Sequence, residues 1–218
     1  MFGKVLVGID GTRAAYEAGR QAARLRAPAG ELVLVAVADP YLAMFNRWGS
    51  GRLFDPRDEH PSGAFDLARA RREERARESL EAMRAQLDPD VRVRVQVAHG
   101  RSWEVLRKIA RDEGADLVAL GGHGTPRLAG ILTGSTATEL LHQAPCSVLV
   151  ARPPFDPGRF PAGVVVGVDG SAGSMAALDA ARSLPPAPPG AGRDGCAMVA
   201  AGATIGVDAL ARLAAPLR

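Results

Sequence analysis

The chain alternates short, continuously apolar runs with longer stretches in which apolar residues recur every three or four positions. Continuous apolar runs are typical of strands buried on both faces of a parallel sheet, and the longer spacing is typical of helices with one buried face. The runs predict buried strands at residues 5–10, 31–37, 115–120 and 146–150. Helices are predicted at residues 13–25, 65–87, 103–112 and 136–143.

One further strand has a different pattern, because Val91, Val93, Val95 and Val97 alternate with polar residues. Such alternation indicates a strand with one covered face at the edge of a sheet. Strands that alternate with helices predict an α/β fold, here a Rossmann-like, doubly wound sheet of five parallel strands with right-handed crossovers. In such a sheet, ligands bind at the carboxyl ends of the strands, where the strand order reverses.

The fourth predicted strand runs into a glycine-rich loop. Its glycines are Gly121, Gly122 and Gly124, and Gly134-Ser135-Thr136 follow at the start of the next helix. Glycines let backbone N–H groups turn toward an anion, and a helix start adds N–H donors and the positive end of its dipole. The arrangement therefore indicates a phosphate site. A purely structural turn is the alternative for the first three glycines, and the donors of the separate helix favour the anion site.

The first predicted strand ends at Asp10-Gly11-Thr12. Asp10 has two readings that can both hold: it caps the following helix or braces the turn, or its carboxylate faces a ligand at the strand end. If the first and fourth strands are neighbours where the strand order reverses, this turn and the glycine loop face one pocket.

The composition favours a globular protein and argues against nucleic-acid binding, a cysteine metal site and a membrane span. The 218 residues are 47% hydrophobic, which allows a sizeable core, and the net charge is +3. Arginines are interleaved with glutamates, so no continuous basic and aromatic strip predicts nucleic-acid binding. Cys146 and Cys196 have no metal-site or disulfide spacing, and Cys146 is expected to be a small buried residue. Without a basic and apolar leader or a membrane-length apolar run, a cytoplasmic protein without membrane contact is expected.

Several separated motifs agree in order and spacing with one known family. They are Val7–Thr12, Val35–Asp39, His99–Arg101, 115–120, the set of Gly121, Gly124, Gly134 and Ser135, and Ala144–Val150. On these motifs, residues 2–152 resemble the universal stress protein family, whose fold is adenine nucleotide alpha-hydrolase-like. The set of glycines and a hydroxyl residue matches the signature of the family's ATP-binding members.

The resemblance implies a set of ligand contacts. Asp10, with Gly11 and Thr12 of the same turn, and the backbone of Val37 would lie near the adenosine end of ATP. The phosphates would be surrounded by Gly121, Gly122, His123, Gly124, Arg127, Gly134, Ser135 and Thr136. The expected ligand is ATP or a related adenine nucleotide, with Mg²⁺ left open, and no residue is assigned to catalysis or to a metal ion. His123 has a second reading as a residue that packs the turn, and Arg127 as one that points to solvent.

A second copy of the first motif follows the family-like region. Val166–Ser171 repeats Val7–Thr12 at an offset of 159 residues, which is 166 minus 7. Many family members carry two domains in tandem, so the sequence predicts a universal stress protein domain at 1–152, a linker at 153–162 and a truncated second repeat at 163–218. The second repeat lacks the glycine signature, and we expect it to dock on the first domain or to be partly disordered, without an ATP site of its own.

Two other segments are candidate contact surfaces. The family's closing strand commonly pairs two subunits, so the resemblance implies a homodimer through Val148–Val150. Residues 39–63 are too long for an ordinary connection, and with Tyr41, Phe45 and Trp48 they are interpreted as a lid or a contact surface.

The sequence leaves three functions to weigh. The first is an ATP-binding regulatory module of the stress response, in which ATP orders the loop at 121–136 and alters dimerisation or partner binding. The second is an enzyme of the same fold that slowly hydrolyses ATP or transfers a nucleotidyl group. Against it, no nucleophile–base pair or carboxylate cluster stands beside the loop, so at most a weak ATPase is expected. The third is a scaffold that has lost its ligand.

Overall fold

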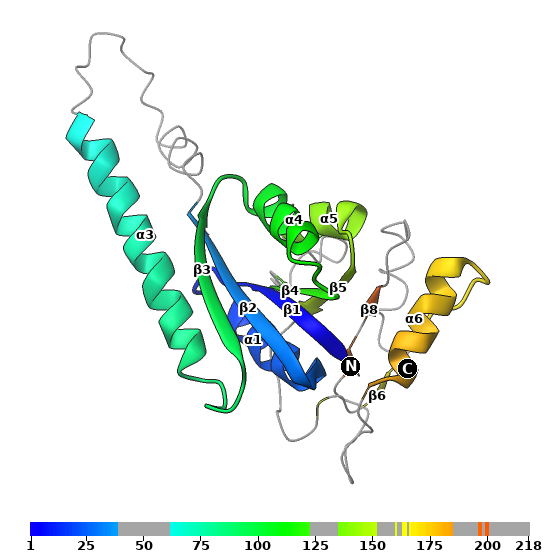
Figure 1. The fold of residues 1–218 in the computed structure, drawn as a ribbon. Helices are drawn as coiled ribbons and strands as arrows, with labels where there is room; N and C mark the ends of the chain where they lie inside the picture. The colour runs from blue at the N-terminus through cyan, green and yellow to red at the C-terminus, as the bar shows by residue number, and fades with distance from the viewer. Residues whose placement is uncertain are drawn as a thin grey trace, which may run out of the picture.

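The structure is a computed structural model, and it describes residues 1–38, 62–122, 135–151, 160, 163–164, 166–184, 196–197 and 199–200. Its larger elements are β1 (Phe2–Gly8), α1 (Arg13–Leu25), β2 (Arg26–Ala38), α3 (Ser62–Arg84), β3 (Val93–His99), α4 (Ser102–Asp112), β4 (Leu117–Gly121), α5 (Ser135–Gln143) and β5 (Ser147–Ala151) (Figure 1). Shorter elements follow: β6 (Gly163–Val164), α6 (Ala172–Arg182), β7 (Cys196–Ala197) and β8 (Val199–Ala200). The segment expected to act as a lid, with Tyr41, Phe45 and Trp48, lies outside the described residues.

β1 lies in the middle of a sheet with the strand order β3-β2-β1-β4-β5-β8. It pairs in parallel with β2 on one side and with β4 on the other, so that Val7 stands opposite Leu34 and Ala119. The strands from β1 to β5 are all parallel to their neighbours, which confirms the predicted doubly wound sheet. Because the strand order reverses between β1 and β4, the two turns predicted to share a pocket follow neighbouring strand ends.

The pairing of β1 with β4 is fixed at its amino end by Asp116. Its carboxylate oxygen Oδ2 accepts hydrogen bonds from the backbone N–H groups of Gly3 at 2.9 Å and Lys4 at 2.8 Å. The backbone N–H of Asp116 in turn donates to the carbonyl oxygen of Lys4 at 2.9 Å. The register of the two central strands is therefore set at the end opposite the predicted site.

The central strands place alternate residues on opposite faces of the sheet, and helices cover both faces. Val5, Val7 and Ile9 pack with α1 and α3 in one core layer, whereas Leu6 packs with α4 and α5 in the other. Figure 1 shows α4 and α5 on one side of the sheet and α1 on the other. Two covered faces explain why the strand forms an uninterrupted apolar run, since Val5, Leu6 and Val7 are all 0% exposed.

α1 begins and ends as the sequence predicts. Thr12 caps its first turn, because the Oγ1 atom accepts a hydrogen bond from the backbone N–H of Ala15 at 3.2 Å. Small side chains on its buried face allow a close approach to the sheet. These residues are Ala15, Ala18 and Ala22, with Leu25 completing the stripe.

β2 is longer than predicted, since it begins at Arg26, directly after α1, rather than near residue 31. The guanidinium of Arg26 braces this early start. Its Nη1 atom donates to the carbonyl oxygens of Ala27, Pro28 and Gly30, each at 2.8 Å. Hydrogen bonds of this kind produce no periodic pattern in the sequence. The hydrophobic pattern therefore predicted the start of the strand too late.

α3 packs on α1 through Met83, whose side chain is fully buried. A Cβ added at Gly19 of α1 would lie 2.4 Å from the Sδ atom of Met83, so the two helices approach closely where Gly19 has no side chain. The helix begins and ends three residues earlier than predicted, and Leu87 packs against the core from the turn that follows. Most of its described charged side chains are exposed, as expected.

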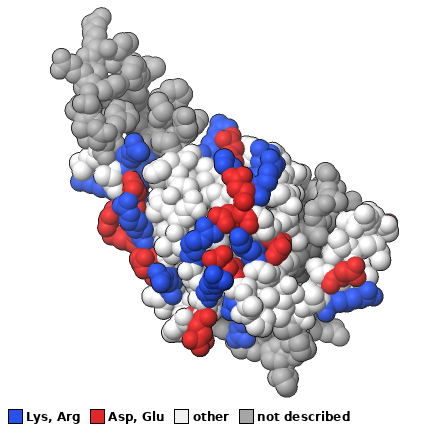
Figure 2. Space-filling model, viewed as in Figure 1, with Lys and Arg blue, Asp and Glu red and all other residues white. Residues whose placement is uncertain are grey.

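The charged surface includes a cluster at the amino ends of the strands. The carboxylate of Glu113 accepts hydrogen bonds from Nη1 and Nη2 of Arg94 at 2.8 and 2.6 Å, and from Nζ of Lys4 at 3.3 Å. Arg94 first, and then Lys4, lower the pKa of Glu113 to about 2. Figure 2 shows positive and negative side chains interspersed on this face of the molecule rather than gathered by sign.

The last described residues form a βαβ unit, in which β6 and β7 are parallel and connected through α6. Ser171 caps α6, since its Oγ atom accepts from the backbone N–H of Ser174 at 3.2 Å. Residues 166–169, which repeat the end of the first strand in sequence, are not in a strand.

β8 pairs antiparallel with β5, so the edge at Val148–Val150 that was expected to join two subunits is partly covered by the chain itself. The homodimer stays a prediction.

The packing of α3 on α1 gives a stability prediction. Met83→Ala removes a fully buried side chain and leaves a cavity against Gly19, so we expect the free energy of unfolding to fall by about 2–5 kcal/mol. The measurement is equilibrium unfolding in urea. Glu78→Ala, an exposed position on the same helix, is the control and is expected to change the free energy by less than about 0.5 kcal/mol. Equal effects of the two changes would contradict the described packing.

The ion pairs of Glu113 give a pH prediction. A carboxyl group with a lowered pKa in the folded state stabilises the fold fully above its unfolded pKa, and loses this effect as the pH falls toward the folded value of about 2. Glu113 is partly exposed, so we expect Glu113→Gln to lower the free energy of unfolding by only about 1 kcal/mol at pH 7. In urea titrations between pH 7 and pH 3, the difference from the wild type should narrow below about pH 4.5. A difference in the free energy of unfolding that stays constant with pH would contradict the lowered pKa of Glu113.

Candidate functional site

A cavity of about 120 Å³ opens at the carboxyl ends of β1, β2 and β4. Residues from separate segments of the chain line it, among them Asp10, Val37, Gly121 and Thr136. All four were predicted from the sequence to contact the ligand. The cavity lies where the strand order reverses, so the fold brings the turn after β1 and the end of β4 to one place, as expected.

Asp10 braces the turn between β1 and α1. Its Oδ1 atom accepts hydrogen bonds from the backbone N–H of Thr12 at 2.9 Å and from the Thr12 hydroxyl at 2.6 Å. Gly11 between them has a φ of +80°, a conformation that glycine adopts readily. The structural reading of this turn therefore holds. Asp10 is nevertheless exposed at the cavity, and its Oδ2 atom makes no hydrogen bond to any described residue.

Gly121 is required by packing. A Cβ added there would lie 2.5 Å from the carbonyl carbon of Ala14 and 2.5 Å from the backbone nitrogen of Ala15. Any side chain at this position would push the first turn of α1 away from β4. The backbone N–H of Gly122 donates to the carbonyl oxygen of Ala151 at 2.7 Å, so this amide extends the pairing of β4 with β5 and is already occupied. The structural alternative for the glycine loop thus holds at its first two positions.

The remaining predicted residues divide into two groups. Ser135 begins α5 and Thr136 lines the cavity from the first turn of this helix, close to the predicted helix start. The others lie outside the described residues: His123, Gly124, Arg127 and Gly134. The described part of the site therefore contains the strand ends, the turn after β1 and the start of α5.

The sequence analysis missed the wall of the cavity that α4 provides. Ser102 and Leu106 line the cavity from the first two turns of this helix. Leu106 and Leu120 are nearly fully buried and, with Val35, give the cavity an apolar surface. The helix start is the signal that was available, because in a parallel sheet the helix after β3 begins at the same edge as the site. Arg101, at the cap position before α4, makes no side-chain capping hydrogen bond, so Ser102 stands beside backbone N–H groups that no capping side chain accepts from.

The lining combines chemically different groups. Asp10 is the charged residue among the described lining residues. An ionised carboxylate only accepts hydrogen bonds, so it suits hydroxyl or amino groups and repels a phosphate. Thr136 lies at the start of α5, where the helix dipole and the unpaired N–H groups suit an anion. The apolar residues of the lining, such as Val35, Leu106 and Leu120, suit a flat, largely apolar group.

The described part of the chain shows neither a metal site nor a reactive thiol. No group of three or more His, Cys, Asp or Glu side chains there is placed to hold a metal ion. Cys146 was expected to be buried and is only partly so, yet burial, assisted by Asp116, raises the pKa of its thiol to about 11. The thiol is therefore protonated at neutral pH and is a poor nucleophile. Among the described helices, none has the length and apolar character needed to span a bilayer.

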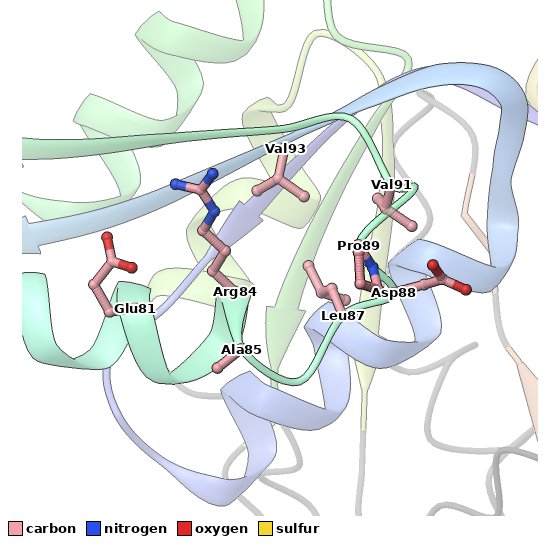
Figure 3. Close-up of a pocket in the computed structure, with 8 residues that line it drawn as sticks. All are labelled: Glu81, Arg84, Ala85, Leu87, Asp88, Pro89, Val91 and Val93. Atoms are coloured by element: carbon pink, nitrogen blue, oxygen red, sulfur yellow. The ribbon is translucent and has the colours of Figure 1, made fainter.

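A larger hollow of about 480 Å³ lies at the other end of the sheet, in the turn from α3 to β3 (Figure 3). Its surface combines Leu87, Val91 and Val93 with the charged side chains of Glu81 and Arg84. The valines and the leucine pack against the core layer beneath. No residue predicted to bind ligand lines it, and parallel sheets bind ligands at the opposite strand ends. We therefore place the functional site in the smaller cavity.

The sequence is similar to known proteins over its first part. The model of the universal stress protein family matches residues 1–152. Universal stress protein Rv2624c of Mycobacterium tuberculosis is 33% identical over 156 residues, which cover 70% of this chain and 49% of that protein. The chain thus spans about half the length of this relative. Universal stress protein Sll1388 of Synechocystis is 28% identical over 159 residues, which cover 69% of this chain and 98% of that protein.

Solved structures agree with the fold. The protein MJ0577 of Methanocaldococcus jannaschii superimposes with a TM-score of 0.55 at 23% identity, covering 72% of this chain and 99% of that one. A universal stress protein from Archaeoglobus fulgidus gives a TM-score of 0.57 at 17% identity, covering 83% of this chain and 61% of that one. Together with the family match over residues 1–152, these findings establish that the chain belongs to the universal stress protein family.

Proposed function

We propose that this protein is an ATP-binding regulatory module, in which the cavity at the ends of β1, β2 and β4 holds the adenine nucleotide. The observation that carries the proposal is the convergence of Asp10, Val37, Gly121 and Thr136 on one cavity. Family membership and the spacing of Gly121, Gly124, Gly134 and Ser135 support it. Occupancy of the site would change how the protein binds its partners in the stress response.

The different chemistry of Asp10 and of the start of α5 suggests how the nucleotide is oriented. The adenosine lies toward Asp10 and Val37, where the spare carboxylate oxygen accepts from a ribose hydroxyl or an amino group. The phosphates lie toward Thr136 and the start of α5. The described cavity of about 120 Å³ is below the range of about 300–1,000 Å³ for ligand pockets, so it encloses only part of a nucleotide. The residues from His123 to Gly134 are proposed to surround the rest.

Mg²⁺ fits this proposal only in a limited way. Magnesium is commonly held by one or two carboxylates together with substrate phosphates, and it keeps several waters. Asp10 is the carboxylate available among the described lining residues. A magnesium ion would therefore arrive with the phosphates of ATP rather than occupy a site built by the protein.

The alternative function is slow hydrolysis of ATP or transfer of a nucleotidyl group. One observation favours it: Oδ2 of Asp10 has no partner among the described residues and stands at the cavity. A carboxylate in this position can accept a proton from an attacking water. The described lining holds no second acid, and no printed hydrogen bond of Asp10 goes to the hydroxyl of Ser102 or Thr136, so we rank this function below ATP binding.

We also propose that residues 163–218 are a truncated second repeat. The turn at Asp169 supports this, because its Oδ1 atom accepts from the backbone N–H of Ser171 at 2.9 Å and Gly170 has a φ of +83°. The turn at Asp10 has the same bond at 2.9 Å and a φ of +80°. Val168, which stands where the buried Ile9 does in the first copy, is 54% exposed, so the described residues do not enclose the second turn as they do the first.

The ATPase alternative is tested with Asp10→Asn. The asparagine oxygen still accepts from Thr12, so the turn is kept, whereas the charge and the base are lost. We expect ATP to be bound by both proteins and hydrolysed by neither above background over several hours, measured by release of phosphate. Wild-type turnover that falls about 100-fold or more in the variant with ATP still bound would instead support an enzyme. Absence of binding at millimolar ATP would refute both functions.

The position of the phosphates is tested with Thr136→Val, which removes the hydroxyl and keeps the shape. A hydrogen bond to a charged group contributes about 1.5–3 kcal/mol, so we expect the Kd for ATP to rise about 10- to 100-fold in titration calorimetry. Thr136→Ser is the matched control and should bind ATP within a few-fold of wild type.

The same variants are titrated with adenosine, which has no phosphate. Its affinity should be equal in the wild type and in Thr136→Val. A parallel loss of adenosine binding would mean that Thr136 contacts the adenosine end, and the proposed direction of the nucleotide would then be wrong.

A further inference from the structure

The first two turns of α4 present one polar and one apolar side chain to the cavity. Ser102 and Leu106 both line it, and residues four apart lie on the same face of a helix. Ser102 is partly exposed, and its hydroxyl makes no hydrogen bond to any described residue. A hydroxyl group can donate one hydrogen bond and accept two. The face of α4 can therefore bond a polar edge of a ligand beside an apolar contact.

The motif His99–Arg101 brings this face to the cavity. Gly100 has a φ of +130°, a conformation that glycine adopts far more readily than other residues. A Cβ added there would lie 3.0 Å from the Cγ2 atom of Val105, in the first turn of α4. The chain thus turns from β3 into α4 through Gly100 and Arg101 alone. The motif therefore serves to place Ser102 at the carboxyl ends of the strands.

Ser102 reaches the cavity from the same side as Val37. Ala98, next to the last residue of β3, pairs with Val37 of β2, and α4 begins directly after the turn that follows β3. Thr136 belongs to α5, which follows β4, and β4 lies on the other side of β1 from β2. Ser102 is therefore assigned to the adenosine end of the proposed ligand, and Thr136 to the phosphate end.

Two leucines give this cavity an apolar floor where Gly8 leaves space for them. A Cβ added at Gly8 would lie 2.6 Å from the Cδ2 atom of Leu120 and 3.2 Å from the Cδ1 atom of Leu106. All three residues line the cavity. Ligand sites commonly combine a mostly apolar lining with a few polar groups that fix the orientation. The leucines suit the flat face of a purine ring, and the Ser102 hydroxyl suits its polar edge.

We propose that Ser102 holds the base of the bound nucleotide. Its hydroxyl makes a hydrogen bond to a nitrogen on the edge of the purine, whose face lies against Leu106 and Leu120. This inference rests on the proposed function, because it assigns a contact within the same nucleotide site. It adds a base-contacting side chain from α4, a helix that the sequence motifs did not connect with the ligand.

The test compares Ser102→Ala with the wild type by titration calorimetry, using ATP and adenosine. The net contribution of a neutral hydrogen bond is modest, so we expect the Kd for both ligands to rise by the same factor, about 3- to 10-fold. Ser102→Thr keeps the hydroxyl and should bind both ligands within a few-fold of wild type. Arg101→Ala, at the exposed position just before α4, is the matched control and should bind both as the wild type does.

Adenine separates a contact with the base from one with the ribose, because it has no ribose. Its affinity, followed by NMR titration, should fall in Ser102→Ala by the factor found for adenosine. Unchanged affinity for adenine or adenosine would overturn the inference. A loss confined to ATP would also overturn it, since Ser102 would then contact the phosphates. Thermal unfolding without ligand checks that each variant folds, and Ser102→Cys takes the place of Ser102→Ala if the alanine variant does not.

Failure of the proposed function gives a different result. A wild type that binds neither ATP nor adenosine at millimolar concentration refutes the nucleotide site, and this inference with it. A wild type that binds both ligands, with Ser102→Ala binding them equally well, refutes only the contact of Ser102 with the base.

Discussion

The parallel pairing of β1 with β4 is the contact on which the site depends. These strands are far apart in the sequence, yet Leu6 stands directly opposite Val118 at the centre of the sheet. Asp116 fixes the amino end of the pair, and Gly121 lets the first turn of α1 approach the carboxyl end. Because the strand order reverses at this pair, the turn after β1 and the end of β4 open into the same space.

Some residues of the site hold the fold together, and others are left to contact a ligand. Gly121 and Gly122 are used by the fold, the first for close packing and the second for a hydrogen bond to β5. Asp10 serves both purposes, since one carboxylate oxygen holds the turn and the other is left at the cavity. Selectivity for a nucleotide would then depend on the residues around this frame, including Ser102 and Thr136 from the helices on one face.

The sequence predicted what depends on periodicity and on local motifs. The helix at 13–25 and the buried strands follow from apolar spacing, and the structure confirms them. The shared pocket was predicted on the condition that the first and fourth strands are neighbours where the order reverses, and the structure meets this condition. Backbone contacts between segments far apart in the sequence produce no periodic pattern or local motif, so they could not be predicted. The motif alone suggested that Gly121 serves a phosphate, and only the fold places it against the backbone of α1. The pairing of β8 with β5 was equally hidden, because a two-residue strand has no measurable period.

The recurring turn has a consequence for how this protein can diverge. The hydrogen bonds that shape it close within a few neighbouring residues, both at Asp10 and at the exposed Asp169. These bonds involve no residue of α4 or α5, so exposed positions of the two helices can change without breaking them. Leu106 of α4 and Ala137 of α5 belong to both the cavity lining and the core, so a change at either position would alter the site and the packing together.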